Sequence, residues 1–96
     1  MKRVEILEKA NEMIGGDRAE DYGSVKENFK CTADLWQVYI YELNRIRDDG
    51  GLILPHDVAI LNILQKVSRL VNSPDHLDSW MDIAGYAALG GEITSE

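Results

Sequence analysis

Hydrophobic residues recur along this chain every three or four positions, the spacing that places side chains on one side of an α-helix. The first such series predicts a helix over about residues 2–14, and Gly15 and Gly16 favour its end because glycine readily adopts the left-handed conformation that closes helices. The apolar members of this series are Val4, Leu7, Ala10 and Ile14. No segment alternates between apolar and polar residues as a strand would.

A second helix is predicted to start at Ser24. The Ser24 hydroxyl can accept from the amide of Glu27 while the Glu27 carboxylate reaches back to the amide of Ser24, an arrangement known as a capping box. The sequence Asp-Asp-Gly-Gly at positions 48–51 favours a turn, so this helix should end before it. The apolar seam of the helix consists of Val25, Phe29, Trp36, Ile40 and Leu43, with Thr32 and Tyr39 at its edge.

Two further helices are predicted to form an antiparallel hairpin. Pro55 suits the first turn of the third helix, which is apolar on most sides and should be the most buried one. The narrow polar stripe of this helix consists of Asn62, Lys66 and Arg69. Ser73 is the expected N-cap of the fourth helix and Pro74 its first helical residue, so the connection is short. The chain should therefore form one all-α domain of four helices over residues 1–96.

Length and charge narrow the classes of partner. A chain of 96 residues lies near the small end of the range in which one domain buries a self-sufficient core, so we expect a homo-oligomer, a dimer or higher, to complete the fold. The net charge of -7 opposes attraction to polymeric DNA or RNA, and no basic cluster overrides it. A small anionic ligand stays open, because a bound divalent cation or local Arg and Lys residues reverse the charge of a site.

The cysteine and histidine content and the hydropathy of the chain argue against an internal disulfide, a zinc site and a membrane span. Cys31 is the single cysteine, which rules out an internal disulfide and leaves a packing or surface thiol. His56 and His76 each lack a second His or Cys at ligand spacing, so zinc is not indicated and both are expected at the surface. No stretch approaches the roughly 20 apolar residues of a membrane span and no signal-peptide core is present, so we expect a cytoplasmic protein.

Three acids lie on one stripe of the fourth predicted helix. Asp75, Asp78 and Asp82 are three and four residues apart, and at roughly 100° per residue these spacings align them with Tyr86. Two carboxylates one turn apart can ligate Mg²⁺ or Mn²⁺, with phosphate oxygens and waters completing the coordination shell. Because like charges at this spacing repel each other, a cation should lie close to them.

Two explanations of the acidic stripe stay open. Lys66 and Arg69 on the preceding helix could form a structural ladder of salt bridges with Asp78 and Asp82, or the two acids could bind a metal ion. Asp57 is a candidate third metal ligand, although an acid in the first turn of a helix also satisfies free backbone amides there.

The polar loop over residues 16–23 offers two further candidates. Arg18 has a planar fork that suits phosphate, and Tyr22 has a ring face that suits stacking on a base. Both residues are equally compatible with a plain polar loop.

Four segments resemble a small family of phage and prophage proteins of unknown function, over roughly residues 5–92. These segments are GDRAEDYG, ENFKCTADLW, PHDVAILNILQKVSRL and HLDSWMDIAGYAAL. More distantly, Lys and Arg on one helix followed by D-x-x-x-D-x-x-x-Y on the next is similar to the nucleotide-modification-associated domains of phages. Those domains resemble the all-α NTP pyrophosphohydrolases of the MazG type. A phage origin would imply the cytoplasm of the host cell.

The MazG resemblance implies a helical dimer or tetramer that uses Mg²⁺ to cleave a nucleoside triphosphate into a monophosphate and pyrophosphate. It also implies roles for particular residues: Asp78 and Asp82 as catalytic metal ligands, Lys66 and Arg69 as phosphate contacts, and Tyr86 or Tyr22 as the base contact. One departure stands against catalysis. MazG-type enzymes carry an E-x-x-E pair on the earlier helix, whereas this chain has Glu27 followed at that spacing by Lys30.

Three functions are therefore compatible with the sequence. The first is a Mg²⁺-dependent nucleotide pyrophosphohydrolase, which the retained acidic pair favours. The second is a non-catalytic oligomer that captures a nucleotide, including a signalling nucleotide of host defence, which the missing E-x-x-E pair favours. The third is a helical interaction protein whose charges form only the salt-bridge ladder.

Overall fold

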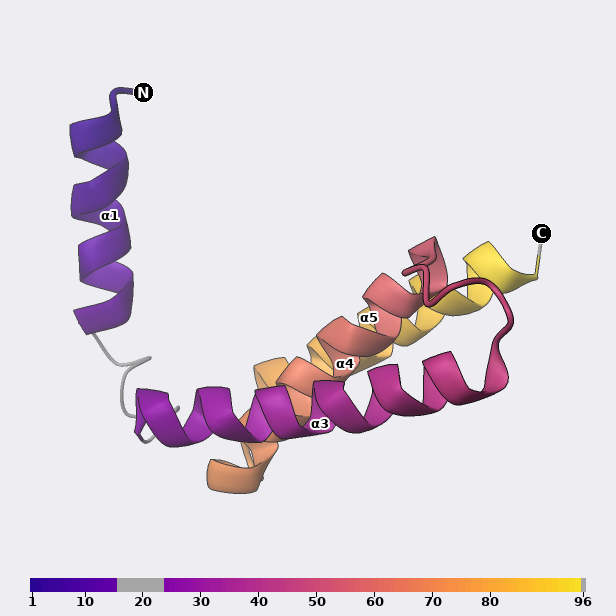
Figure 1. Ribbon diagram of the computed structural model, residues 1–96. Helices are drawn as coiled ribbons and strands as arrows, with labels where there is room; N and C mark the ends of the chain where they lie inside the picture. The colour runs from indigo at the N-terminus through magenta and orange to yellow at the C-terminus, as the bar shows by residue number, and fades with distance from the viewer. Residues whose placement is uncertain (16–23, 96) are drawn as a thin grey trace.

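A computed structural model of the chain describes residues 1–15 and 24–95, and these residues form helices and turns with no strand among them (Figure 1). The helices are α1 (Arg3–Gly15), α3 (Val25–Ile46), α4 (Pro55–Asn72) and α5 (Leu77–Thr94). The all-α fold expected from the sequence is confirmed. No helix in the described part of the chain is long and apolar enough to cross a membrane.

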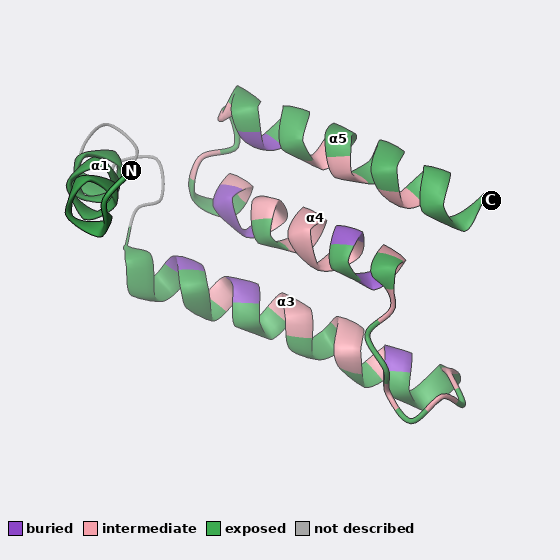
Figure 2. Cartoon of the chain, turned by 90° about the horizontal axis from the view of Figure 1, so that it is seen from above, coloured by how far each residue is buried: buried purple, intermediate pink, exposed green. Residues whose placement is uncertain are grey.

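Three of the helices form a single layer. α3, α4 and α5 lie side by side with α4 in the middle, and α1 stands apart from them (Figure 1, Figure 2). α4 packs on both of its neighbours, and the chain reverses direction between α4 and α5, which is the predicted hairpin. Every residue of α1 is exposed. One chain therefore forms an open three-helix layer instead of a bundle closed around one core.

The starts of α3 and α4 follow the local chemistry of the sequence. Ser24 caps α3, since its Oγ accepts from the amide of Glu27 at 3.4 Å. Pro55 opens α4 at a position where a missing N–H costs no intrahelical bond. In the turn before α4, Gly50 and Gly51 have φ angles of 74° and 78°, a region that glycine occupies without strain. Both predicted starts are confirmed.

α5 starts later than the sequence predicts. Ser73 is not its N-cap and Pro74 is not its first residue, because a separate turn precedes the helix, in which the amide of His76 donates to the carbonyl of Ser73 at 3.0 Å. His76 takes the N-cap position instead. Proline suits the second position of such a turn as well as the first turn of a helix. As a result Asp75 lies in the turn and not on the helical stripe.

Polar side chains hold α3 against α4. The Oγ of Ser68 lies 2.6 Å from Oγ1 of Thr32 and 3.5 Å from Nδ2 of Asn28, and all three residues are buried. Further along the contact, Nε1 of Trp36 donates to the backbone carbonyl of Leu61 at 2.8 Å. Because these groups are directional, they define one register between the two helices.

The apolar core of one chain is small. Among the described residues, Leu43 and Ala59 are the buried hydrophobic ones, and the side chains with almost no exposed surface belong to Asp57, Ser68 and Ser79. A Cβ added at Gly90 of α5 would lie 3.1 Å from Cβ of Ala59, so this glycine lets α4 and α5 approach closely. α4 has more buried residues than the other described helices, as expected, yet most of its apolar side chains stay half-exposed.

Candidate functional site

A lysine and a carboxylate predicted for the site meet between α4 and α5. Nζ of Lys66 lies 3.2 Å from Oδ2 of Asp82, an ion pair that joins the two helices. The Lys66 side chain is 18% exposed and that of Asp82 is 47% exposed. The lysine stem is therefore mostly covered while the charged end reaches the more open carboxylate.

Three more of the predicted residues extend this pair along one side of the layer. Arg69 follows Lys66 by three positions in α4 and is buried. In α5, Asp78 lies one turn before Asp82 and is exposed, and Tyr86 lies one turn after it and is half-buried. We call Lys66, Arg69, Asp78, Asp82 and Tyr86 the polar strip.

The charges of the polar strip sum to zero, because it holds two cationic and two anionic side chains. No group of three His, Cys, Asp or Glu side chains within the described ranges is placed to hold a metal ion. Proteins commonly bind Mg²⁺ through one or two carboxylates, with phosphate oxygens and water in the other positions. Asp78 and Asp82 therefore fit a cation that arrives with a phosphate ligand better than a cation alone.

Asp57 is the centre of a different cluster, at the start of α4. Its carboxylate accepts from Nη1 and Nη2 of Arg47 at 2.7 and 2.9 Å and from the amide of Leu54 at 2.7 Å. The hydroxyl of Tyr39 in α3 also donates to it. The Asp57 side chain has no exposed surface, so these donors satisfy a buried charge. We call Tyr39, Arg47 and Asp57 the clasp.

The clasp fixes the protonation states of its members. The hydrogen-bonded Arg47 guanidinium holds the pKa of Asp57 well below its usual range, with help from Tyr39 and the Leu54 amide, while burial acts the other way. Burial, followed by the bond to Asp57, raises the pKa of Tyr39. The same carboxylate raises the pKa of Arg47. At neutral pH the clasp is an ion pair with a neutral phenol, which suits a structural role.

Asp57 is not placed to act as a third metal ligand beside Asp78 and Asp82. It precedes Lys66 by nine residues, about 13 Å along α4 at 1.5 Å per residue. It also pairs with α3 and the turn that follows, whereas Asp82 pairs with α4. The oxygens of Asp57 are occupied by the clasp. The expectation of a three-carboxylate metal site is therefore corrected: the structure separates Asp57 from the acidic pair.

Two members of the clasp, Arg47 and Tyr39, are not predicted as site residues from the sequence. Arg47 is the C-cap residue of α3 in an extended conformation, and it reaches Asp57 across the turn, so no helical spacing relates the two. Tyr39 offered a weak signal: it stands at the edge of the apolar seam, and a buried phenol usually finds a partner for its hydroxyl.

Both histidines are less exposed than the sequence predicts. His56 is half-buried with Nε2 3.3 Å from Nη2 of Arg47, because it stands beside the clasp. His76 is half-buried with Nδ1 2.7 Å from Oγ of Ser79, because it forms the start of α5. Neither histidine therefore sits on an open surface.

Other predicted residues fall elsewhere. Arg18 and Tyr22 lie outside the described residues. Lys30 follows Glu27 by three positions, and its Nζ pairs with Oδ2 of Asp34 at 2.8 Å on the exposed side of α3. The earlier helix thus uses this position for a surface ion pair. Cys31 is half-buried, in line with a packing role.

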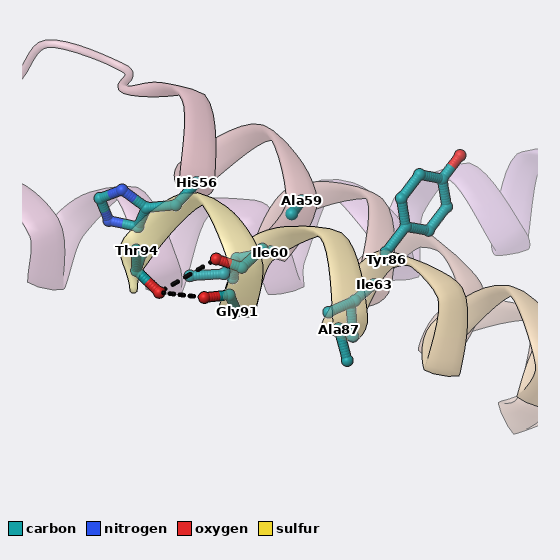
Figure 3. A pocket seen from close by; sticks show the side chains of 9 residues that line it. His56, Ala59, Ile60, Ile63, Tyr86, Ala87, Gly91 and Thr94 are labelled. Carbon is teal, nitrogen blue, oxygen red and sulfur yellow. Dashed lines mark hydrogen bonds between the residues drawn. The ribbon is translucent and has the colours of Figure 1, made fainter. Parts of the chain in front are cut away.

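A hollow of about 200 Å³ lies between α4 and α5. His56 and Thr94 line one end of it and Tyr86 the other, and the Tyr86 ring points away from Ile63 and Ala87 (Figure 3). Ligand sites for drug-sized molecules usually measure about 300–1,000 Å³. The hollow is small for a whole nucleotide, so the polar strip remains the stronger candidate.

The fold and the polar strip define a class of protein: a small all-α chain that carries two cationic and two carboxylate side chains on one side of a three-helix layer. The chain belongs to the family described as "Domain of unknown function (DUF6378)", whose model matches residues 5–94. The match covers all of the described helices except the first residues of α1.

Two relatives are proteins of mycobacteriophages. The "Gene 55 protein" of Mycobacterium phage L5 is 41% identical over 86 residues, which make up 90% of this chain and 50% of the relative. The "Gene 55 protein" of Mycobacterium phage D29 is 39% identical over 92 residues, 95% of this chain and 54% of the relative. The chain spans about half the length of these relatives. No solved structure matches it. The expected membership of a phage family is confirmed.

Proposed function

We propose that this protein binds a nucleotide on the polar strip, with Lys66 and Arg69 contacting the phosphate chain. The Lys66–Asp82 pair carries the proposal. It holds a lysine whose stem is largely covered and whose ammonium lies next to a carboxylate that has a second carboxylate, Asp78, one turn away. Lysine and arginine are common phosphate-binding residues, and Tyr86 at the end of the strip offers a ring for the base.

Charge favours a ligand that brings Mg²⁺ with it. The strip is neutral by itself and the whole chain carries -7, so neither attracts a triphosphate strongly. A divalent cation shared by Asp78, Asp82 and the phosphate oxygens would supply the missing positive charge. We therefore expect nucleotide binding to depend on Mg²⁺.

Hydrolysis is the second candidate function, and the acidic pair one turn apart is the observation in its favour. The resemblance to MazG-type pyrophosphohydrolases assigns Asp78 and Asp82 to the metal, which would activate a water for attack at phosphorus. Those enzymes hold a further acidic pair on the earlier helix. In this chain that position belongs to Lys30, which is paired with Asp34, so capture of the nucleotide is better supported than its cleavage.

The test is calorimetric titration of the protein with ATP, GTP, CTP and UTP and their deoxy forms, with and without Mg²⁺. Replacing Lys66 by Met keeps the covered stem and removes the charge, so Lys66→Met should weaken binding about 10-fold or more, the size of a lost charge-assisted hydrogen bond. Lys66→Arg keeps the charge and should retain most of the affinity. Lys30→Met is the matched control, because Lys30 also pairs with an aspartate but lies on α3.

Equal affinity of Lys66→Met and wild type would contradict the proposed site. The nucleotide recovered after titration then separates capture from cleavage. Intact nucleotide supports capture, whereas Mg²⁺-dependent release of pyrophosphate that Asp82→Asn abolishes supports hydrolysis. If no nucleotide binds, the Lys66–Asp82 pair is only a structural salt bridge, and the chain is better described as a helical interaction protein.

A further inference from the structure

One chain exposes far more surface than a globular protein of its mass. Its accessible surface is 7224 Å², whereas a folded monomer of 10.8 kDa is expected to expose about 5,500 Å². The radius of gyration is 15.9 Å, compared with about 12.5 Å for a compact domain of 96 residues. One chain therefore exposes about 1,700 Å² more than expected, and α1, whose residues are all exposed, accounts for part of this area.

Much of the extra surface is apolar. Valine, leucine, isoleucine, methionine and aromatic side chains are exposed on every helix, and examples at or above half exposure include Leu7, Phe29, Val71 and Trp80. Valine, leucine, isoleucine, methionine and phenylalanine are among the residues most often buried in folded proteins. A partner therefore has to cover part of it.

Two apolar stripes run side by side across the layer. On α4 the stripe is Ile60, Leu64, Val67 and Val71, and on α5 it is Trp80, Ala84, Ala87 and Gly91, both with the spacing i, i+4, i+7, i+11 of one helix side. Ile60 and Ala87 line the same hollow between the helices, which shows that the two stripes adjoin (Figure 3). We call them together the apolar face.

The apolar face and the polar strip lie on different sides of the layer. At 100° per residue, Arg69 is about 170° round α4 from the centre of the α4 stripe, and Val58 is about 150° round from it. On α5, Ala87 points away from Tyr86 (Figure 3). A partner on the apolar face would therefore leave the polar strip accessible.

We infer that a second copy of this chain covers the apolar face, so that two three-helix layers pack face to face as a dimer. The eight residues of the face carry no charge. Two copies can therefore pack these faces together about a two-fold axis without bringing like charges of the faces into contact. A stable interface buries about 800 Å² on each partner, which is about half of the extra surface of about 1,700 Å² on one chain.

The test is sedimentation equilibrium of the whole protein with two matched variants of α4. Val71 is 72% exposed on the apolar face and Val58 is 50% exposed on the other side, so both can be replaced by lysine with little disturbance of the single chain. One chain has a mass of 10.8 kDa. Wild type and Val58→Lys should both sediment with twice this mass. The Val71→Lys dimer should dissociate at protein concentrations at least tenfold higher than those at which the wild-type dimer dissociates.

A second readout covers the case in which the dissociated chain unfolds. Because a folded state that requires a partner gains stability by mass action, the thermal midpoint of the wild type should rise with protein concentration. A monomeric wild type with a concentration-independent midpoint would overturn the inference. Equal dissociation by Val58→Lys and Val71→Lys would overturn it as well, because the interface would then not be the apolar face.

Discussion

The carboxylate of Asp57 joins three segments of the chain. α3 supplies the Tyr39 hydroxyl, the end of α3 supplies Arg47, and the loop before α4 supplies the amide of Leu54. The sequence predicts an acid that satisfies backbone amides at a helix start, and the Leu54 contact confirms this. It does not predict the cation, because Arg47 comes from a non-periodic turn. The metal role expected for Asp57 is not supported, because the Arg47 guanidinium, which the sequence does not predict there, holds its carboxylate oxygens.

Asp57→Asn should lower the free energy of unfolding by about 2–3 kcal/mol, the cost of removing a buried, charge-assisted set of hydrogen bonds. The substitution keeps the shape of the side chain but leaves Arg47 without its bidentate partner. Urea denaturation followed by circular dichroism measures the change. Asp48→Asn, at an exposed aspartate in the same turn, is the control and should change stability little.

The clasp also predicts how stability depends on pH. The pKa of Asp57 is lower in the folded chain than the unfolded value of about 3.9, so its contribution is present above that value and is lost as pH falls toward the folded pKa. Stability of the wild type should therefore fall as pH drops below about 4, and Asp57→Asn should show a shallower fall. Parallel pH profiles for the two proteins would show that the ion pair does not stabilise the fold.

At the scale of the helices, apolar periodicity and turn residues predicted the described helices and most of their starts. The capping serine of α3, the proline at the start of α4 and the hairpin of α4 with α5 are all confirmed. The start of α5 was wrong by a few residues, because Ser73 and Pro74 suit a turn and a helix start equally. The polar contact of α3 with α4 had no periodic signal, since Asn28 and Thr32 meet Ser68 only after the helices pack.

The close approach of α4 and α5 gives a prediction at this scale. Alanine in place of a mid-helix glycine normally stabilises a helix by about 1 kcal/mol. Gly85→Ala should show this gain, because nothing lies within 4 Å of its added Cβ. Gly90→Ala should gain less or lose stability, because its Cβ would lie 3.1 Å from Cβ of Ala59. Equal gains in thermal unfolding would mean that Gly90 does not set the distance between the helices.

The whole molecule is a layer with two different sides. The sequence predicts that a chain of this length needs oligomers, and the large exposed area supports this, but the sequence does not say which side of α4 faces a partner. α3 and α5 flank α4 on opposite sides, which leaves two further sides of α4. One of these two sides is apolar, and the other carries Arg69. Within the polar strip, the contact of Lys66 with Asp82 could be predicted, because the hairpin makes these two residues neighbours.

The most direct test of the polar strip is a thermal-shift screen of the purified protein against linear and cyclic nucleotides, with and without Mg²⁺. A ligand at 100 times its Kd stabilises the folded state by about 2.7 kcal/mol, enough to raise the Tm of a chain of this size by roughly 10 °C or more. We predict a Mg²⁺-dependent rise in Tm for at least one phosphate-bearing nucleotide, and no such rise for Lys66→Met. An unchanged Tm for the wild type across the panel would contradict the account.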